Sequence, residues 1–305
     1  MDTITLKARG KINLTLDVIG KRDNGYHDLD MIMQTINLYD TIKIKKTKTP
    51  GIRIHNNLTW LPADHRNIAY KAAQLFLKEA DIVSGIYIDI VKRIPVAAGL
   101  AGGSSDAAAV LVGMNKLFKT GYSKKQLMEM GVKIGADVPF CIMRGTVLAQ
   151  GIGEVLTPIK PLPYTHLLLV KPNISVSTAS VYKALQINTI KTHPQTESVV
   201  QAINKGDTDY IFSHMVNVLE GVTTKMHPEI EKIKAQMIEH GAISSMMSGS
   251  GPTVFGIFDS KKKAQLAADF FKVACELREV HVTSTFHRGK REGRKYGRRK
   301  SKHEN

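Results

Sequence analysis

Residues 94–111, IPVAAGLAGGSSDAAAVL, carry the strongest structural signal in this chain of 305 residues. They follow a short alternating segment, residues 85–93, which is typical of a β-strand. Three glycines and two serines come next, and an alanine-rich run then has apolar residues at helical spacing, namely Ala107, Leu111, Met114 and Phe118. The pattern predicts a strand, a glycine-rich turn and a helix, with Ser104 as the N-cap residue of that helix.

A glycine-rich turn that leads into a helix N-terminus is suited to bind phosphate. The first backbone N–H groups of a helix have no intrahelical partner and lie at the positive end of its dipole. An ordinary strand-to-helix connection also uses glycine, but three glycines within five residues and a serine pair exceed what a tight turn requires. The loop fits neither common phosphate motif, because no lysine follows its glycines and Gly-x-Gly-x-x-Gly is absent. We expect nucleotide phosphates to bind here.

Nearly letter for letter, this stretch resembles the second motif of the GHMP small-molecule kinases. Residues 10–14, GKINL, are similar to the first motif of that family, and residues 247–256, MSGSGPTVFG, are similar to the third. Ala101 is a departure, because many members have glycine there. An alanine with positive φ would cost about 1 kcal/mol, so we expect Ala101 at negative φ and nucleotide binding to be retained.

The resemblance implies an α+β, two-domain GHMP kinase fold. Residues 1–160 would form an ATP-binding domain like domain 2 of ribosomal protein S5, and residues 161–287 a ferredoxin-like domain. Three prolines at 161, 163 and 172 place the junction near the start of that segment. ATP would be the co-substrate, with Mg²⁺ carried on its phosphates, since no carboxylate cluster indicates a separate metal site. The ATP-binding residues would be Pro95, Val96, Ala97, Ala98, Gly99, Leu100, Ala101, Gly102, Gly103, Ser104 and Ser105.

Periodicity outside the motifs predicts further elements. Helices are expected near 67–80, 123–134, 177–186, 196–205, 227–240 (with Pro228 at its first position) and 261–275. Strands are expected near 12–18, 29–38, 41–46, 51–55, 243–247, 253–258 and 279–286.

Two polar side chains of the first motif, Lys11 and Asn13, are two residues apart on a predicted strand and so share one face. Spacing alone favours the solvated face of an edge strand. The resemblance instead implies that Lys11 lies near the transferred phosphoryl group and the carboxylate of Asp137.

Asp137 precedes Val-Pro, and Pro139 biases Val138 away from a helix, so we expect the carboxylate just beyond a helix end. A lone aspartate there is more often a cap or turn residue, and its role as the catalytic base is implied by the family.

A second group of residues bears on which alcohol accepts the phosphoryl group. Gly25-Tyr26-His27 and residues 135–140, GADVPF, resemble the branch of the family that phosphorylates the 2-hydroxyl of 4-diphosphocytidyl-2-C-methyl-D-erythritol in the non-mevalonate isoprenoid route. The resemblance implies that Tyr26 packs on the cytosine ring and that His27 forms a hydrogen bond with the polar edge of that base. Without the resemblance, the two residues would be interpreted as part of an exposed turn. The other implied contacts are Thr178 and Tyr182 from the second domain, a glycine turn at Gly249, Gly251 and Thr253, and Asn67 beside adenine.

Composition and charge limit the class of protein. No apolar stretch approaches 18 residues and no apolar leader is evident, so we expect neither a membrane span nor a signal peptide. Cys141 and Cys275 lack metal or redox spacing and indicate reduced thiols in the cytoplasm. The net charge is +16, and residues 288–305 contain nine basic residues against two Glu. We expect this tail to be disordered; it is either a solvated terminus or a weak binder of nucleic acid or anionic lipid.

The sequence is compatible with three functions. The leading one is ATP-dependent phosphorylation of the cytidylyl alcohol. The others are a GHMP kinase for another small alcohol, similar to mevalonate or homoserine, and a catalytically silent relative that binds nucleotide or nucleic acid. The sequence predicts neither the oligomeric state nor the rate of turnover.

Overall fold

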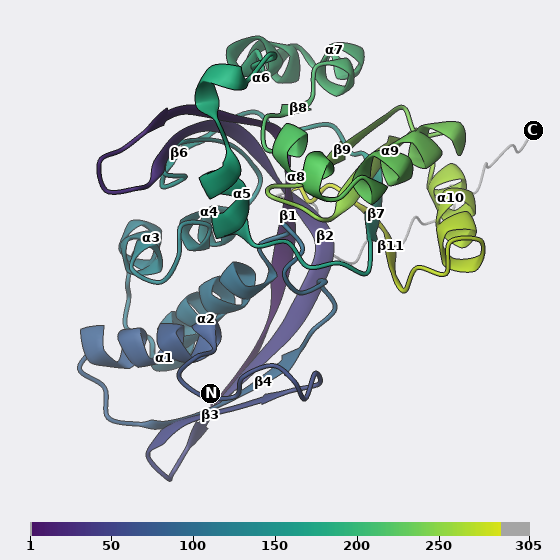
Figure 1. Ribbon diagram of the computed structural model, residues 1–305. Helices are drawn as coiled ribbons and strands as arrows, with labels where there is room; N and C mark the ends of the chain where they lie inside the picture. Colours follow the sequence, from purple (N-terminus) through teal and green to yellow (C-terminus); the bar gives the residue numbers. More distant parts are fainter. Residues whose placement is uncertain (1, 288–305) are drawn as a thin grey trace, which may run out of the picture.

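The computed structural model describes residues 2–287, so the basic tail expected at 288–305 lies outside the described residues. Two β-sheets, each with helices packed against it, make up the described part (Figure 1). None of the helices of residues 2–287 combines the length and apolar character needed to cross a membrane.

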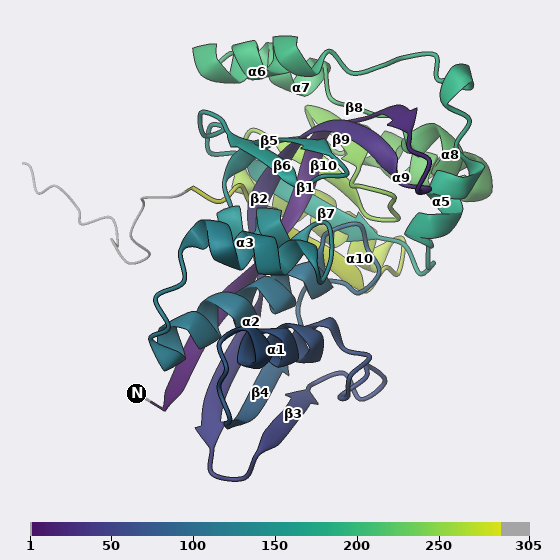
Figure 2. The same ribbon diagram turned by 90° about the vertical axis from the view of Figure 1, so that its left-hand side faces the viewer.

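The first sheet has the strand order β3-β4-β2-β1-β8, and β5 and β6 extend it from β2. Four helices, α1 to α4, belong to this half, and α1, α2 and α3 form a layer beside the sheet (Figure 2). The strands are β1 (Thr3–Lys21), β2 (His27–Thr47), β3 (Gly51–Asn56), β4 (Gly85–Val91), β5 (Thr146–Gly151), β6 (Val155–Pro158) and β8 (Val216–Asn217). The helices are α1 (Ile68–Glu79), α2 (Gly102–Phe118), α3 (Lys124–Val132) and α4 (Val138–Met143).

The second sheet is antiparallel, with the order β11-β7-β10-β9. Its strands are β7 (His166–Lys171), β9 (Ser244–Met247), β10 (Val254–Phe258) and β11 (Glu279–Ser284). Helices α9 (Glu229–Glu239) and α10 (Lys261–Val273) pack on it. Between β7 and α9 the chain forms α5 (Thr178–Ala184), a 3₁₀ turn (Ile187–Thr189), α6 (Thr196–Lys205), α7 (Thr208–Ser213) and α8 (Glu220–Met226).

Strand β7 shows how one element serves two hydrophobic clusters. Leu168 and Val170 belong to the larger cluster, which includes Phe271 of α10, whereas Leu167 and Leu169 belong to the second. This alternation follows from the period of two in a strand. The second cluster therefore joins the two sheets, since it also contains β1 and β2 residues such as Ile12 and Ile36.

Further contacts tie the two sheets together. Ile36 of β2 forms an isolated antiparallel bridge with Thr285, and the Asn37 side-chain amide donates to Ser284 Oγ at 2.9 Å. Strand β8, which follows α7 in the sequence, pairs in parallel with Thr15 and Leu16 of β1. The second half of the chain thus completes the sheet of the first half.

The α+β architecture expected from the sequence is confirmed, with a separate sheet in each half of the molecule. The expected strand at 12–18 belongs to a much longer β1, which is paired on both sides by β2 and β8. The pairing with β8 is limited to Thr15 and Leu16, but the face that carries Lys11 and Asn13 is buried and not solvated. A register shift between Asn13 and Thr15 sends Leu14 and Leu16 into different clusters.

Some local expectations are wrong. Helix α2 begins at Gly102 after Ala101, so Ser104 lies inside the first turn and is not the N-cap. Ala101 has φ of 55°, in the left-handed region, and not the negative φ that its side chain favours. The runs 29–38 and 41–46 form a single strand, β2. Pro228 is the N-cap residue of α9 and not its first residue. Val138 is helical, because it begins α4.

Candidate active site

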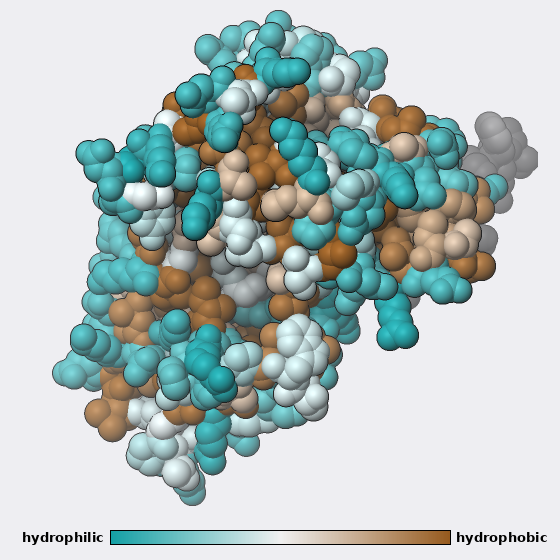
Figure 3. Space-filling view, in the orientation of Figure 1, coloured by the Kyte–Doolittle hydropathy of each residue, from teal (hydrophilic) through white to brown (hydrophobic). Residues whose placement is uncertain are grey.

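A cavity of about 990 Å³ lies between the two halves of the molecule and is lined from both. The space-filling view shows the surface hollowed near the middle of this face, between the α1–α3 region and α5 (Figure 3). The first half lines it with β1, the β1–β2 turn, the loop before α2 and the start of α4. The second half contributes α5 and the turn between β9 and β10.

The loop before α2 is built to present free backbone amides. The first intrahelical bond of α2 runs from Ser105 N to Ala101 O at 2.8 Å, so the amides of Gly102, Gly103 and Ser104 have no intrahelical acceptor. Both Ala97 and Ala101 adopt positive φ, of 50° and 55°. These two residues bend the backbone of the loop beside the cavity. The arrangement is that of an anion site at a helix N-terminus.

The third motif braces this loop from the other half of the chain. Ser248 Oγ donates to Gly99 O at 3.0 Å, and Lys11 N donates to Leu100 O at 3.1 Å. A Cβ on Gly99 would lie 2.1 Å from Ser248 O, and its φ is 72°, so only glycine fits. The second and third motifs are therefore one packed unit.

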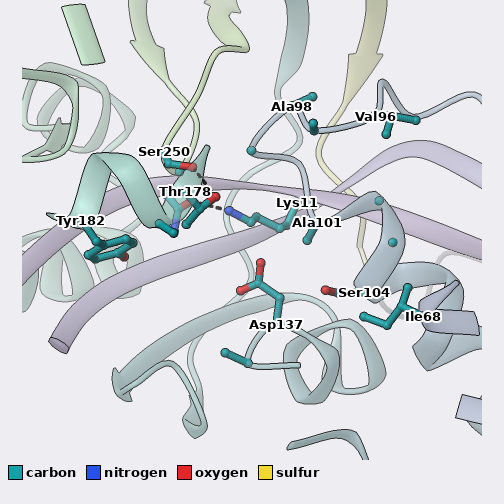
Figure 4. Close-up of a pocket in the computed structure, with 18 of the residues that line it drawn as sticks. Lys11, Ile68, Val96, Ala98, Ala101, Ser104, Asp137, Thr178, Tyr182 and Ser250 are labelled. Carbon is teal, nitrogen blue, oxygen red and sulfur yellow. Dashed lines mark hydrogen bonds between the residues drawn. The ribbon is translucent and has the colours of Figure 1, made fainter. Parts of the chain in front are cut away.

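Lys11 and Asn13 act together on β1. Lys11 Nζ donates to Asn13 Oδ1 at 2.7 Å, and Asn13 Nδ2 donates to Met31 Sδ at 3.3 Å. Both residues are at least 95% buried and both line the cavity. Asn13 therefore orients the ammonium group toward the cavity (Figure 4).

Asp137 occupies the N-cap position of α4, but its side chain makes no cap hydrogen bond. Its carboxylate points into the cavity below the Lys11 ammonium (Figure 4). Burial lowers the pKa of Lys11, and the charge of Asp137 opposes that effect. The two groups thus form an electrostatic pair on facing walls of the cavity.

Cys141 lies behind this pair and takes no part in the cavity lining. Burial raises the pKa of its thiol to about 12, with Asp137 adding to the shift. The hydroxyl of Ser105 donates to Arg9 O at 2.5 Å and lies 3.3 Å from Cys141 Sγ. Both groups belong to the packed interior.

The other end of the cavity is aromatic. The rings of His27 and Tyr182 are 5.1 Å apart at an interplanar angle of 35°, and Tyr26 beside them is 56% exposed. Burial raises the pKa of Tyr182, so its hydroxyl stays protonated. The hydroxyls of Thr178 and Ser250 share a hydrogen bond of 2.8 Å on the same side as Tyr182 (Figure 4).

Most of the sequence-predicted residues meet at this cavity. Those that line it are Lys11, Asn13, Tyr26, His27, Asn67, Pro95, Val96, Ala97, Ala98, Gly99, Ala101, Gly102, Gly103, Ser104, Asp137, Thr178, Tyr182 and Gly249. Four others do not line it, namely Leu100, Ser105, Gly251 and Thr253. Leu100 is buried in the second cluster, and Thr253 is fully buried behind the third-motif turn.

Sequence reasoning missed several lining residues. Lys92 and Asp106 line the cavity and share a buried hydrogen bond of 2.6 Å, and Ser250 lies beside Thr178. Asp106 directly follows the serine pair, which is a signal that could have been used. Lys92 follows β4 as an ordinary polar residue, and only the fold shows its partners. The remaining missed residues include Lys21, Asn56, Leu61, Pro62, Arg66, Ile68, Ile90 and Lys183.

Comparison with known proteins agrees with this geometry. Residues 67–145 match the family model described as GHMP kinases N terminal domain, and residues 199–276 match GHMP kinases C terminal. The 4-diphosphocytidyl-2-C-methyl-D-erythritol kinase of Lachnoclostridium phytofermentans is 54% identical over 94% of this chain and 98% of its own length. The enzyme of the same name from Lachnospira eligens is 50% identical over 94% and 99%.

Solved structures give the same result. A crystal structure of 4-(cytidine 5'-diphospho)-2C-methyl-D-erythritol kinase is 30% identical, with a TM-score of 0.79, and covers 92% of this chain and 99% of that one. Homoserine kinase from Cytophaga hutchinsonii, at 20% identity and a TM-score of 0.73, covers 94% and 95% and shares the fold. From its motifs, its fold and these relatives, the chain belongs to the GHMP kinases and, among them, to the family of 4-diphosphocytidyl-2-C-methyl-D-erythritol kinases.

Proposed function

We propose that this chain transfers the γ-phosphoryl group of ATP to the 2-hydroxyl of 4-diphosphocytidyl-2-C-methyl-D-erythritol. One observation carries the proposal: Lys11 and Asp137 line the cavity together with both the glycine-rich loop and the aromatic residues Tyr26, His27 and Tyr182. A phosphate donor on the loop and a nucleobase at the aromatic end would have the acceptor alcohol between them. The names of the relatives support the same acceptor.

Phosphoryl transfer requires alignment, charge stabilisation and a destination for one proton. The acceptor oxygen forms the new bond to the γ-phosphorus as the bond to the β-phosphate oxygen breaks, which releases ADP. A carboxylate is in general far too weak a base to ionise an alcohol in the ground state. Asp137 therefore accepts the hydroxyl proton late, as the new P–O bond makes that proton acidic, while Lys11 offsets charge on the phosphoryl oxygens.

ATP would arrive with Mg²⁺. Among residues 2–287 no group of three or more His, Cys, Asp and Glu side chains is arranged to hold a metal ion. The cation would instead be held mainly by phosphate oxygens and water, as is usual for Mg²⁺ in kinases. The protein's part is to bind the phosphates at the α2 N-terminus.

The proposal is tested by ATP consumption with three alcohols in parallel: the cytidylyl alcohol, mevalonate and homoserine. We expect turnover with the cytidylyl alcohol alone, and product analysis should place the phosphate on its 2-hydroxyl. Turnover with mevalonate or homoserine instead would assign the chain to another acceptor. Nucleotide binding without turnover on any of the three would indicate a silent relative.

A further inference from the structure

A buried charge cluster adjoins the N-terminus of α2. Lys92 Nζ donates to Asp40 Oδ2 at 2.5 Å and to Asp106 Oδ2 at 2.6 Å, and all three side chains are at least 94% buried. A Cβ on Gly102, the first residue of α2, would lie 3.4 Å from Lys92 Nζ. The cluster is therefore next to the amides that face the phosphate position.

One atom of this cluster has no partner. Asp106 Oδ1 is buried and makes no hydrogen bond among the described residues, and Asp106 lines the cavity. A buried polar atom without a partner destabilises the folded protein, and an ionised carboxylate oxygen at that place would repel a phosphate. A proton on Oδ1 and a ligand oxygen as its acceptor would remove both penalties.

We propose that Asp106 binds ATP as a neutral carboxylic acid, whose Oδ1–H donates a hydrogen bond to a phosphate oxygen while Oδ2 accepts from Lys92. The inference rests on the proposed binding of ATP at this loop. Other enzymes keep a buried carboxylic acid neutral so that it donates to a developing anion. Asp106 would then be a binding residue that discriminates for phosphate at the helix N-terminus.

The charges around Asp106 favour the neutral form. Burial raises its pKa to about 8, with the Lys92 charge opposing and the Asp40 charge adding to the rise. The second carboxylate of the cluster has partners on both oxygens, because Asp40 Oδ1 accepts from the amides of Arg93 and Ile94 at 2.5 and 2.8 Å and its Oδ2 accepts from Lys92.

The elements packed around Asp106 supply the other relevant groups. Lys92 follows β4, Asp40 comes from β2, and α1 presents the apolar Ile68 to the cavity. Lys11 and Asp137 line the same cavity. The acid form binds phosphate, so affinity is full below pH 7 and falls as the pH rises through 8.

The test measures the dissociation constants of ATP and adenosine by calorimetry between pH 7 and 9, in EDTA and again with Mg²⁺. The variants are Asp106→Asn, which keeps a neutral donor at every pH, and Asp106→Ala, which removes the donor; melting temperatures check folding. Burial also lowers the pKa of Lys11, so its own titration would add to any pH dependence of ATP binding. The ratio of wild-type to Asp106→Asn constants cancels that contribution.

For ATP, we expect that ratio to rise about tenfold from pH 7 to pH 9, as the protonated fraction falls by that factor. The ratio for adenosine, which has no phosphate, should stay flat, and Asp106→Ala should weaken ATP binding about tenfold or more at pH 7. Three results would overturn the inference. The pH dependence of ATP binding could be the same in the wild type and in Asp106→Asn, or adenosine could show an equal pH step. The third result is an effect of Asp106→Asn that appears only with Mg²⁺. Absence of turnover on the cytidylyl alcohol, with the pH step in ATP binding present, would overturn the proposed function alone.

Discussion

The Asp137 carboxylate faces Lys11 across the cavity and makes no hydrogen bond within its own helix. Asp137→Asn keeps the shape and removes the proton acceptor, so we expect turnover to fall by a factor of about 10² to 10⁴. The KM for ATP and the melting temperature should change little. Steady-state kinetics check this, with Asp259→Asn on the surface as the control. Turnover close to wild type would refute the role of Asp137 as proton acceptor.

Tyr26 is largely exposed and lines the aromatic end of the cavity, where the proposed function places the cytosine. Stacking of one base on an aromatic ring contributes about 1–3 kcal/mol, so Tyr26→Ala should raise the KM for the cytidylyl alcohol about tenfold or more. The KM for ATP should stay within about twofold. Tyr164→Ala is a matched control, because that tyrosine is 54% exposed and lies outside this cavity. Equal effects of Tyr26→Ala on both substrates would contradict stacking.

Ala101 holds a left-handed conformation at the start of α2. This conformation is unfavourable for alanine by about 1 kcal/mol, and glycine adopts it freely. Ala101→Gly should therefore raise the free energy of unfolding by up to about 1 kcal/mol. Ala80→Gly is the control: its φ is −94°, so the same change should destabilise by about 0.5–1 kcal/mol. Urea denaturation measures both, and a loss of stability in Ala101→Gly would show that no strain is relieved.

Among single residues, the sequence predicted those whose chemistry is fixed by a motif and missed those whose role depends on a distant partner. Lys11, Asp137 and Tyr26 could be named because the motifs that contain them match a known family. Lys92 and Asp106 are 14 residues apart, and their pairing with Asp40 arises only when β2, β4 and α2 pack together. The left-handed Ala101 was also missed, because intrinsic backbone preference is overridden by the contacts of the loop with β1.

Among elements, the turn between β9 and β10 depends on one buried amide. Asn217 Nδ2 donates to Met247 O and Gly249 O at 2.9 and 2.8 Å, and its Oδ1 accepts from Leu219 N. Asn217→Ala leaves these buried groups without partners, so we expect a loss of about 2–4 kcal/mol in unfolding free energy and a marked fall in turnover.

Ser248→Ala is the comparison for Asn217→Ala, because it removes a single hydrogen bond, the one to Gly99 O. It should destabilise by about 0.5–1.5 kcal/mol. Urea titrations of the two variants in parallel provide the measurement. An Asn217→Ala protein as stable as Ser248→Ala would mean that the turn does not depend on the amide.

Long elements with regular periodicity were predictable, whereas most short helices were not; the seven-residue α5, expected near 177–186, is an exception. Helices α1, α3, α6, α9 and α10 lie where the apolar spacing indicated them. Helices α4, α7 and α8 have six or seven residues each, too few to show a repeat above chance. The register shift in β1 was also invisible, because a bulge depends on how two strands pair and not on either strand alone.

At the scale of the whole molecule, the two halves are joined through β8 in the first sheet, the bridge between Ile36 and Thr285, and a shared hydrophobic cluster. Such extensive joining predicts unfolding in one cooperative step over the described residues. Differential scanning calorimetry should give a calorimetric enthalpy equal to the van't Hoff enthalpy. Two resolved transitions would show that the halves unfold independently.

Strand β1 has one further consequence. It is bonded along one side to β2 and for two residues on the other to β8, and it carries Lys11 and Asn13 near its middle. Tyr26 and Tyr182 instead belong to the turn after β1 and to α5, which are peripheral elements of the same cavity. Under the proposed function, acceptor preference and phosphoryl-transfer chemistry would therefore depend on separate structural elements. A redesign of these peripheral elements for another alcohol would leave Lys11 anchored where it is.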